Sequence, residues 1–265
     1  MIRRAVLSEL FRLRRPRLLA GWFGLTALFT LLINSVVFTI GESLPPGAGP
    51  GVTFPDAATL AGPDGLVAGL AAASSMFGVI TLSFWALASA TDHTSGMIRL
   101  LAAAQPRRWV LLAGKVGALV LVTAVATTVA VVVNVGVAPV AAEASGLDVS
   151  AWRSDTTASG ILGAWGTAFL AQMVWGATGR ALATGTRSAA PAISTGVGWV
   201  LVVESVVSRL LDGEVRWLPG TVLTAVAAGG DNEPSSGARL APGPSYAAVS
   251  PGAAATTLVR RDITD

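Results

Sequence analysis

The sequence predicts an all-α, polytopic integral membrane protein, and its composition and the grouping of its apolar residues carry that prediction. The 265 residues are 52% hydrophobic and only 12% charged, whereas an ordinary soluble domain has roughly 25% charged residues. Mean hydropathy is +0.66. The apolar residues form long blocks instead of recurring at amphipathic spacing, which is the pattern of membrane-spanning helices.

Five blocks are long enough to cross a bilayer, because a hydrocarbon core of ~30 Å needs about 20 apolar residues in a helix. They are rich in Leu, Val and Ala, with the small residues that membrane helix packing favours. We predict spans at residues 18–40, 66–90, 116–140, 161–182 and 189–211. A single transmembrane domain over residues 1–265 would contain them all.

The charges predict the orientation of these spans. Basic residues mark cytoplasmic segments of membrane proteins. Residues 1–17 hold six arginines and residues 41–65 hold three acids without a basic residue, so the first belongs inside and the second outside. Residues 91–115 then carry four basic residues and return inside. We expect the protein to lie in the plasma membrane, with both chain ends in the cytoplasm.

A sixth span over residues 238–259 is needed to keep the C-terminal Arg260 and Arg261 inside. With six spans, 14 of the 18 basic residues lie inside and ten of the 15 acids lie outside. This segment contains three prolines, but prolines occur in membrane helices where neighbours satisfy the freed backbone groups. We therefore predict six spans.

The N-terminal segment, residues 1–17, predicts an amphipathic helix ahead of the first span. Ile2, Val6, Leu10 and Leu13 recur at helical spacing, with arginines on the other faces. Such a helix lies in the interface, contacts membrane lipid and forms an elbow before the first span. A secretory signal peptide is the alternative, but the following apolar run of about 23 residues exceeds the 7–15 of a signal.

The sequence offers no set of residues for catalysis. It has no cysteine and one histidine, His93, so the usual thiolate and histidine clusters are missing. A phosphate-binding loop reads G-x-x-x-x-G-K-[ST]. Around Gly114 and Lys115, Trp109 replaces the first glycine and Val116 follows the lysine. We expect no enzyme activity from this chain alone, and no catalytic, metal or cofactor site.

Polar residues inside the predicted spans are few, and two of them, Gln172 and Glu204, are candidates for contact with a transported molecule. The alternative for Glu204 is a structural role, in which its carboxylate turns to the outer interface and pairs with arginine. Coupling to an ion gradient calls for several buried ionisable groups, which the spans do not provide.

The cytoplasmic connector, residues 91–115, contains D-H-T-S-G-M-I-R, then P-R-R and a lysine at the start of the next span. In this order of residues it resembles the first cytoplasmic loop of type 2 ATP-binding-cassette permeases. The ending R-R-D-I-T, the elbow helix and the six-span plan resemble the same family. Met97 and Asp92 depart from its usual pattern, which has a small hydroxyl residue and Glu. The residues that carry the likeness are Asp92, Gly96, Arg99, Pro106, Arg107, Arg108 and Lys115.

The resemblance implies a bacterial permease subunit that moves hydrophobic or amphipathic molecules, such as drugs or antibiotics, out of the cell. It implies a separate ATPase subunit, which would bind ATP and Mg, docked on the seven connector residues above. It further implies a permease homodimer or a sister permease, and no nucleic-acid partner. The alternative is that the basic residues only enforce topology, in a non-transporting membrane anchor or regulatory protein.

Overall fold

The computed structural model describes residues 2–40, 54–55, 57–94, 108–153, 157–210 and 219–227, and within these ranges every regular element is a helix. The prediction of an all-α protein is confirmed for this part of the chain. The elements are α1 (Ile2–Leu13), α2 (Pro16–Ile40), α3 (Ala57–Ala61), α4 (Gly65–Ala72), α5 (Ser74–Thr94), α7 (Arg108–Ala144), the 3₁₀ turn η2 (Ser150–Arg153), α8 (Thr157–Thr186), α9 (Ala189–Gly198), the π-helix η3 (Trp199–Val203), α10 (Glu204–Leu210) and α11 (Pro219–Ala227).

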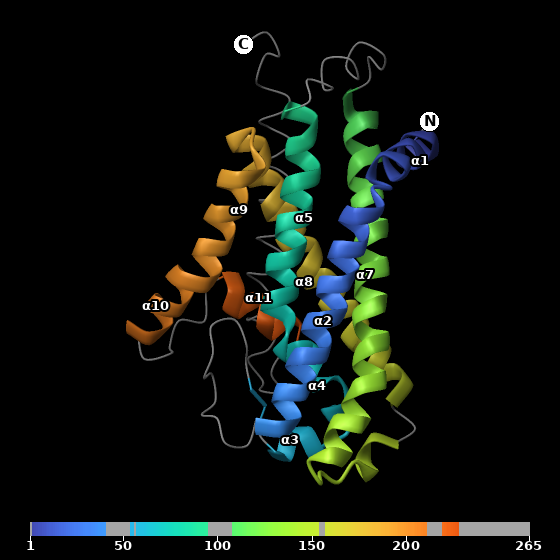
Figure 1. Cartoon of the computed structure of the whole chain (residues 1–265), viewed down its shortest axis with the longest axis vertical. Helices are drawn as coiled ribbons and strands as arrows, with labels where there is room; N and C mark the ends of the chain where they lie inside the picture. Colours follow the sequence, from blue (N-terminus) through green and yellow to red (C-terminus); the bar gives the residue numbers. More distant parts are fainter. Residues whose placement is uncertain are drawn as a thin grey trace.

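The long helices form an elongated bundle in which α5 packs most extensively on α8, and α2 on α7 (Figure 1). The upper end joins α1, the last turns of α5 and α8, and the first turns of α7 and α9. The lower end joins the last turns of α2 and α7 to α3, α4, η2 and the start of α8. Successive long helices therefore run along the bundle in alternating directions.

In the described part of the chain, two helices are by length and composition long and apolar enough to cross a membrane: Pro16–Thr39 and Trp109–Ala144. The predicted span 66–90 is broken, because Gly65–Ala72 and Met76–Thr91 meet at an angle of 48°. Counted as one span, that pair is a third candidate. The coarse prediction of apolar spanning helices is thus confirmed for α2 and α7.

The other predicted spans stand differently. Residues 161–182 lie in α8, which is helical over 30 residues but does not have the hydropathy of α2 and α7. Residues 189–211 begin a shorter apolar helix, Ala189–Val203, which continues as α10. The predicted sixth span at 238–259 lies outside the described residues.

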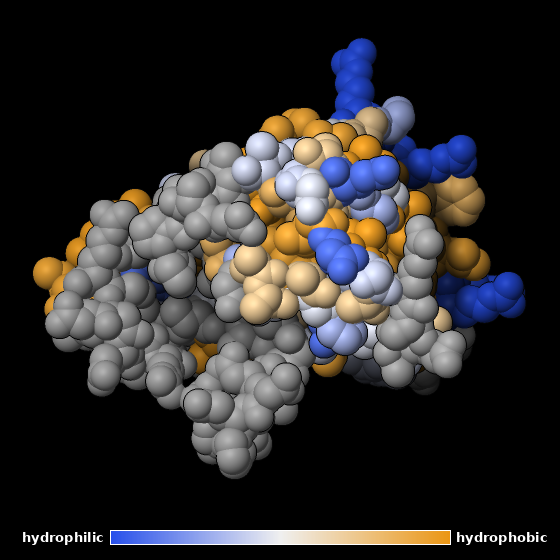
Figure 2. All heavy atoms as spheres, turned by 90° about the horizontal axis from the view of Figure 1, so that it is seen from below, coloured by the Kyte–Doolittle hydropathy of each residue, from blue (hydrophilic) through white to orange (hydrophobic). Residues whose placement is uncertain are grey.

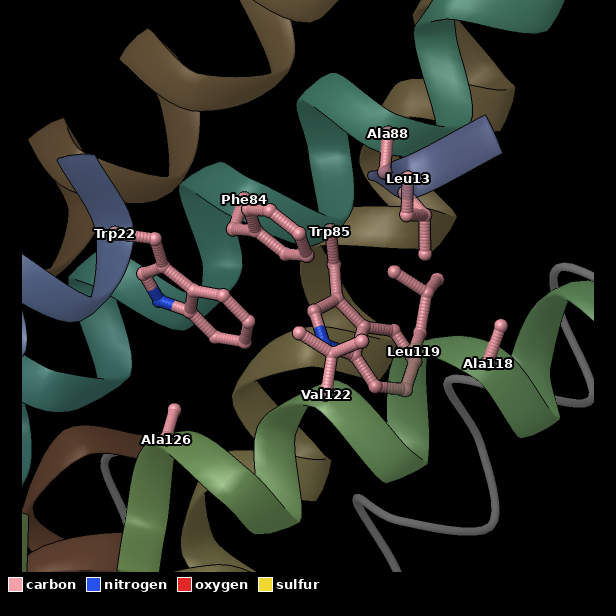
Figure 3. Packing of buried hydrophobic residues seen from close by; sticks show 9 residues of the cluster. All are labelled: Leu13, Trp22, Phe84, Trp85, Ala88, Ala118, Leu119, Val122 and Ala126. Atoms are coloured by element: carbon pink, nitrogen blue, oxygen red, sulfur yellow. The ribbon is translucent and has the colours of Figure 1, made fainter. Parts of the chain in front are cut away.

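An aromatic cluster holds the upper half of the bundle together (Figure 3). The rings of Trp22 on α2 and Phe84 on α5 stack with centroids 3.9 Å apart and planes 10° from parallel. Trp85 lies beside Leu119 and Val122 of α7. Aromatic stacking contributes about 0.5–1.5 kcal/mol beyond the burial of area, so this cluster fixes α2, α5 and α7 relative to one another.

Glycines let α5 and α8 approach closely. Gly78 of α5 faces the indole of Trp175 on α8, and Gly176 of α8 faces the indole of Trp85 on α5. A Cβ at Gly176 would lie 2.6 Å from the Trp85 ring. Each helix therefore offers a glycine to a tryptophan of the other, and small residues at such contacts are the usual means of close helix packing in membranes.

Candidate functional site

The helix α1 rests on a glycine face of α7 at the upper end of the bundle. A Cβ at Gly114 would lie 2.7 Å from the Cβ of Ala5, and a Cβ at Gly117 would lie 2.9 Å from a methyl group of Val6. Leu13, at the end of α1, packs into the same cluster as Ala88 of α5 and Ala118 of α7 (Figure 3). The predicted amphipathic helix is confirmed, and one of its apolar sides is covered by protein.

The predicted connector residues lie around this contact where the structure describes them. Asp92 is in the last turn of α5, and Arg108 is the first residue of α7. Lys115 follows two turns later, next to Gly114, and only 9% of it is exposed. The remaining four, Gly96, Arg99, Pro106 and Arg107, lie outside the described residues. The packing role of Gly114 and Gly117 is not among the predictions from the sequence. Their spacing of three residues, which places both on one face of α7, is the feature that could have indicated it.

Gln172 lies at the centre of a buried polar network between α5, α7 and α8. Its Oε1 accepts a hydrogen bond from the hydroxyl of Thr81 at 2.9 Å, and its Nε2 donates to the hydroxyl oxygen of Thr127 at 3.0 Å. Thr127 donates to the carbonyl of Thr123, whose hydroxyl oxygen accepts from the Trp85 indole at 3.0 Å. Gln172 is 3% exposed. In this conformation its amide therefore links three helices of the bundle and does not face a cavity.

A second buried polar group joins α2, α4 and α7. Asn34 donates from Nδ2 to the Oδ1 of Asn134 at 3.0 Å, and Asn134 donates to the carbonyl of Leu66 at 2.7 Å. Gly69 lies against the Asn34 side chain, where any Cβ would overlap the amide. Since hydrocarbon offers no partner to a polar group, such internal hydrogen bonds are what a membrane interior requires.

Glu204 holds the short helix α11 in place. Its carboxylate accepts a hydrogen bond from the backbone N–H of Gly220 at 3.0 Å, in the first turn of α11. At the other end of α11, the hydroxyl of Thr167 on α8 donates to the carbonyl of Ala227 at 3.1 Å. Both polar ends of α11 therefore form hydrogen bonds with side chains of other helices, as helix ends inside a protein must.

The carboxylate of Glu204 is buried, with 6% of the residue exposed. The expectation that it turns to the outer interface is wrong for this structure. Glu204 follows the five-residue π-helix η3 directly, and π-helical turns shift the face that the next residues present. Gly220 could not be predicted as its partner, because the two residues are 16 positions apart in the chain.

Basic residues outnumber acids at the upper end of the bundle, and acids outnumber basic residues at the lower end. The exposed arginines of α1 and the α1–α2 turn lie at the upper end, where α7 starts with Arg108 and the α8–α9 turn contains Arg187. The lower end has Asp64, Glu143 and Asp148 in its turns and helix ends. The Ser150 N–H donates to Asp148 at 2.9 Å and lowers the pKa of that exposed carboxyl.

The described residues offer polar contacts and charges and little for direct chemistry. No three side chains of His, Cys, Asp or Glu among them come together in a way that would hold a metal ion. No known family model and no curated protein matches the chain.

Proposed function

We propose that this chain is the permease subunit of an ATP-binding-cassette exporter, driven by a separate ATPase subunit. The observation that supports this most is the meeting of α1, α5 and α7 at one end of the bundle, through Leu13, Ala88 and Ala118. The connector between α5 and α7 leaves and re-enters the bundle at that end. A protein docked there would contact the mouths of two long helices and the elbow helix together.

A separate source of energy follows from the residues themselves. The sequence has no phosphate-binding loop, and Gly114, the glycine of the only Gly-Lys pair, serves the packing of α1. A conformational change of the docked ATPase would move the connector and, with it, α7, which extends over 37 residues to the other end of the bundle. In this proposal, α7 carries the conformational change from one end of the bundle to the other.

The proposed substrate is hydrophobic or amphipathic and moves outward across the plasma membrane, with both chain ends in the cytoplasm. In one chain, Gln172 is enclosed and Glu204 is bound to α11. A substrate that reaches Glu204 would have to displace α11 first. We therefore place the proposed pathway between two permease chains, with α11 as the element that moves.

The experiment looks for an ATP-binding-cassette ATPase gene next to the gene of this chain and combines its product with the purified chain. We expect the two to copurify, and the permease to change the ATPase rate after reconstitution. Arg99→Glu and Gly96→Pro should reduce efflux and association, whereas Arg187→Glu, a reversal in the α8–α9 turn, should leave both unchanged. Full efflux and association in the two connector variants would reject docking at this segment. Lack of any ATPase partner would favour the membrane anchor.

A further inference from the structure

The outward side of α1 is an exposed strip of arginines and large apolar side chains. Opposite the α7 contact made by Ala5 and Val6, it presents Arg3, Arg4, Leu7, Ser8 and Phe11, all exposed. Phe11 is 70% exposed. Arg14, just past the helix end, and Arg15 and Arg17 are exposed as well. In Figure 2, hydrophilic groups project on the side where α1 lies in Figure 1.

The acid nearest to this strip does not neutralise it. Glu9 is the only acidic residue in α1, it is buried on the side toward α7, and it forms an ion pair with Arg12. No other acid occurs in residues 2–17. All charged residues of the outward strip are therefore positive. Leu7 and Phe11 lie between Arg3 and Arg4 at one end and Arg14 at the other.

We propose that this strip is a binding site for anionic phospholipid headgroups. A helix lying at the interface inserts its large apolar side chains among the acyl chains and keeps its basic groups at the headgroup level. Leu7 and Phe11 would be the inserted side chains. Guanidinium groups at both ends would bind phosphate by paired hydrogen bonds. The occupant is a membrane lipid and not a soluble phosphate, because a soluble anion leaves Leu7 and Phe11 in water.

Anionic lipid at this site would also hold α1 against α7. The inner side of α1 contacts Gly114 and Gly117, so lipid bound on the outer side would keep α1 at the membrane surface while α7 fixes its inner side. Lipid charge would thus set the position of the elbow helix next to the start of α7. The proposal rests on the membrane location in the proposed function and not on transport.

The absence of cysteine from the chain makes a local test possible. Ser8→Cys, on the exposed strip, is labelled with a fluorophore, and the full chain is reconstituted in phosphatidylcholine vesicles with a minority of phosphatidylglycerol. In one preparation only the phosphatidylglycerol carries brominated acyl chains, and in the other the same fraction of phosphatidylcholine does. Bromine quenches fluorophores nearby, so the ratio of quenching reports which lipid is enriched at α1.

We expect brominated phosphatidylglycerol to quench several-fold more strongly, and 0.5 M salt to reduce the difference, because salt screens surface charges. Each arginine contributes about a fivefold preference near an anionic surface. Arg3→Gln/Arg4→Gln/Arg14→Gln should therefore lower the ratio several-fold, to what the remaining exposed Arg15 and Arg17 maintain. The matched triple lysine variant should keep most of the preference, and Arg187→Gln should keep all of it.

Phe11→Ser separates insertion from charge. It should weaken quenching by both brominated lipids and leave their ratio unchanged. Equal quenching by the two lipids in the unmodified strip, or a ratio that the triple glutamine variant leaves unchanged, would overturn the proposal. None of these measurements needs an ATPase, so failure of the proposed transport function leaves the result intact.

Discussion

Glu204 and Gly220 join α10 to α11 by one hydrogen bond of 3.0 Å between a buried carboxylate and a backbone N–H. Pro219, the first residue of α11, has no N–H, so Gly220 carries the first backbone donor of the helix. A Cβ at Gly220 would overlap the carboxylate. The glycine is therefore needed for the acid to reach the helix end, and the negative charge favours the positive end of the helix dipole.

We expect Glu204→Ala to loosen the first turn of α11. Loss of a capping side chain costs about 1 kcal/mol, which corresponds to roughly fivefold faster amide exchange if the turn opens locally. Glu204→Gln keeps an acceptor oxygen and should change exchange much less. Hydrogen exchange with mass spectrometry of a peptide covering residues 219–227 measures the difference.

Thr167→Ala is the matched control at the far end of α11, where the hydroxyl meets the Ala227 carbonyl. It should affect the last turn and spare the first. Equal protection of α11 in the Glu204→Ala variant and the parent chain would mean that packing alone holds this helix.

The contact between α1 and α7 should depend on glycine at position 114. Gly114→Leu places a side chain where the backbone of Ala5 lies 3.0 Å from an added Cβ, and backbone cannot give way as a flexible side chain can. We expect α1 to move off α7, so that a single cysteine at half-buried Val6 reacts several-fold faster with a maleimide.

Gly136→Leu is the control, because Gly136 lies on the same helix with open space around it. It should leave the reaction rate at position 6 unchanged. An unaltered rate in the Gly114→Leu variant would show that α1 is held by something other than this close approach.

The Gln172 network predicts strong coupling between its members. Gln172→Leu leaves the hydroxyl of Thr81 without its buried acceptor, and an interhelical hydrogen bond in a membrane protein contributes about 0.6 kcal/mol, up to about 1.7. We expect a loss of stability of that order. Thr81→Val with Gln172→Leu should cost less than the sum of the single changes, because both partners are then apolar.

Unfolding in mixed micelles with increasing denaturing detergent measures these free energies. Ser35→Ala, at an exposed hydroxyl that bonds only within α2, provides the comparison. Strict additivity of the Thr81 and Gln172 changes would contradict a direct interaction between them.

The apolar blocks of the sequence predicted where the long helices lie, because local composition determines both. The block at 66–90 did not predict the break at Ala73, although Ser74 and Ser75 follow it directly, because serines also occur inside unbroken membrane helices. The break depends on distant partners: the Leu66 carbonyl accepts from Asn134, and Gly69 accommodates Asn34. A single sequence does not reveal such pairings.

The candidate site was predictable in part for the same reason. Gln172 and Glu204 stood out because they are polar residues in apolar surroundings, a local property. Their partners, Thr127 and Gly220, are ordinary residues on other helices. Gly114 precedes a lysine, as a glycine does in a nucleotide-binding motif. Its contact with Ala5 of α1 identifies it as a packing residue. Which residues matter was visible locally, and what they do depends on the fold.

The division of charge between the two ends predicts the orientation of the chain. Exposed Ser145, beside the acidic lower end, should lie outside the cell, and exposed Thr186, near Arg187 in the α8–α9 turn, should lie inside. The chain has no cysteine, so Ser145→Cys and Thr186→Cys each introduce a single reactive thiol. In intact cells, a membrane-impermeant maleimide should label position 145, and position 186 only after permeabilisation.

Arginines near span ends determine which side stays in the cytoplasm, so the reverse labelling pattern would contradict the charge argument. Labelling of both positions from outside would mean that the chain between residues 145 and 186 does not cross the membrane.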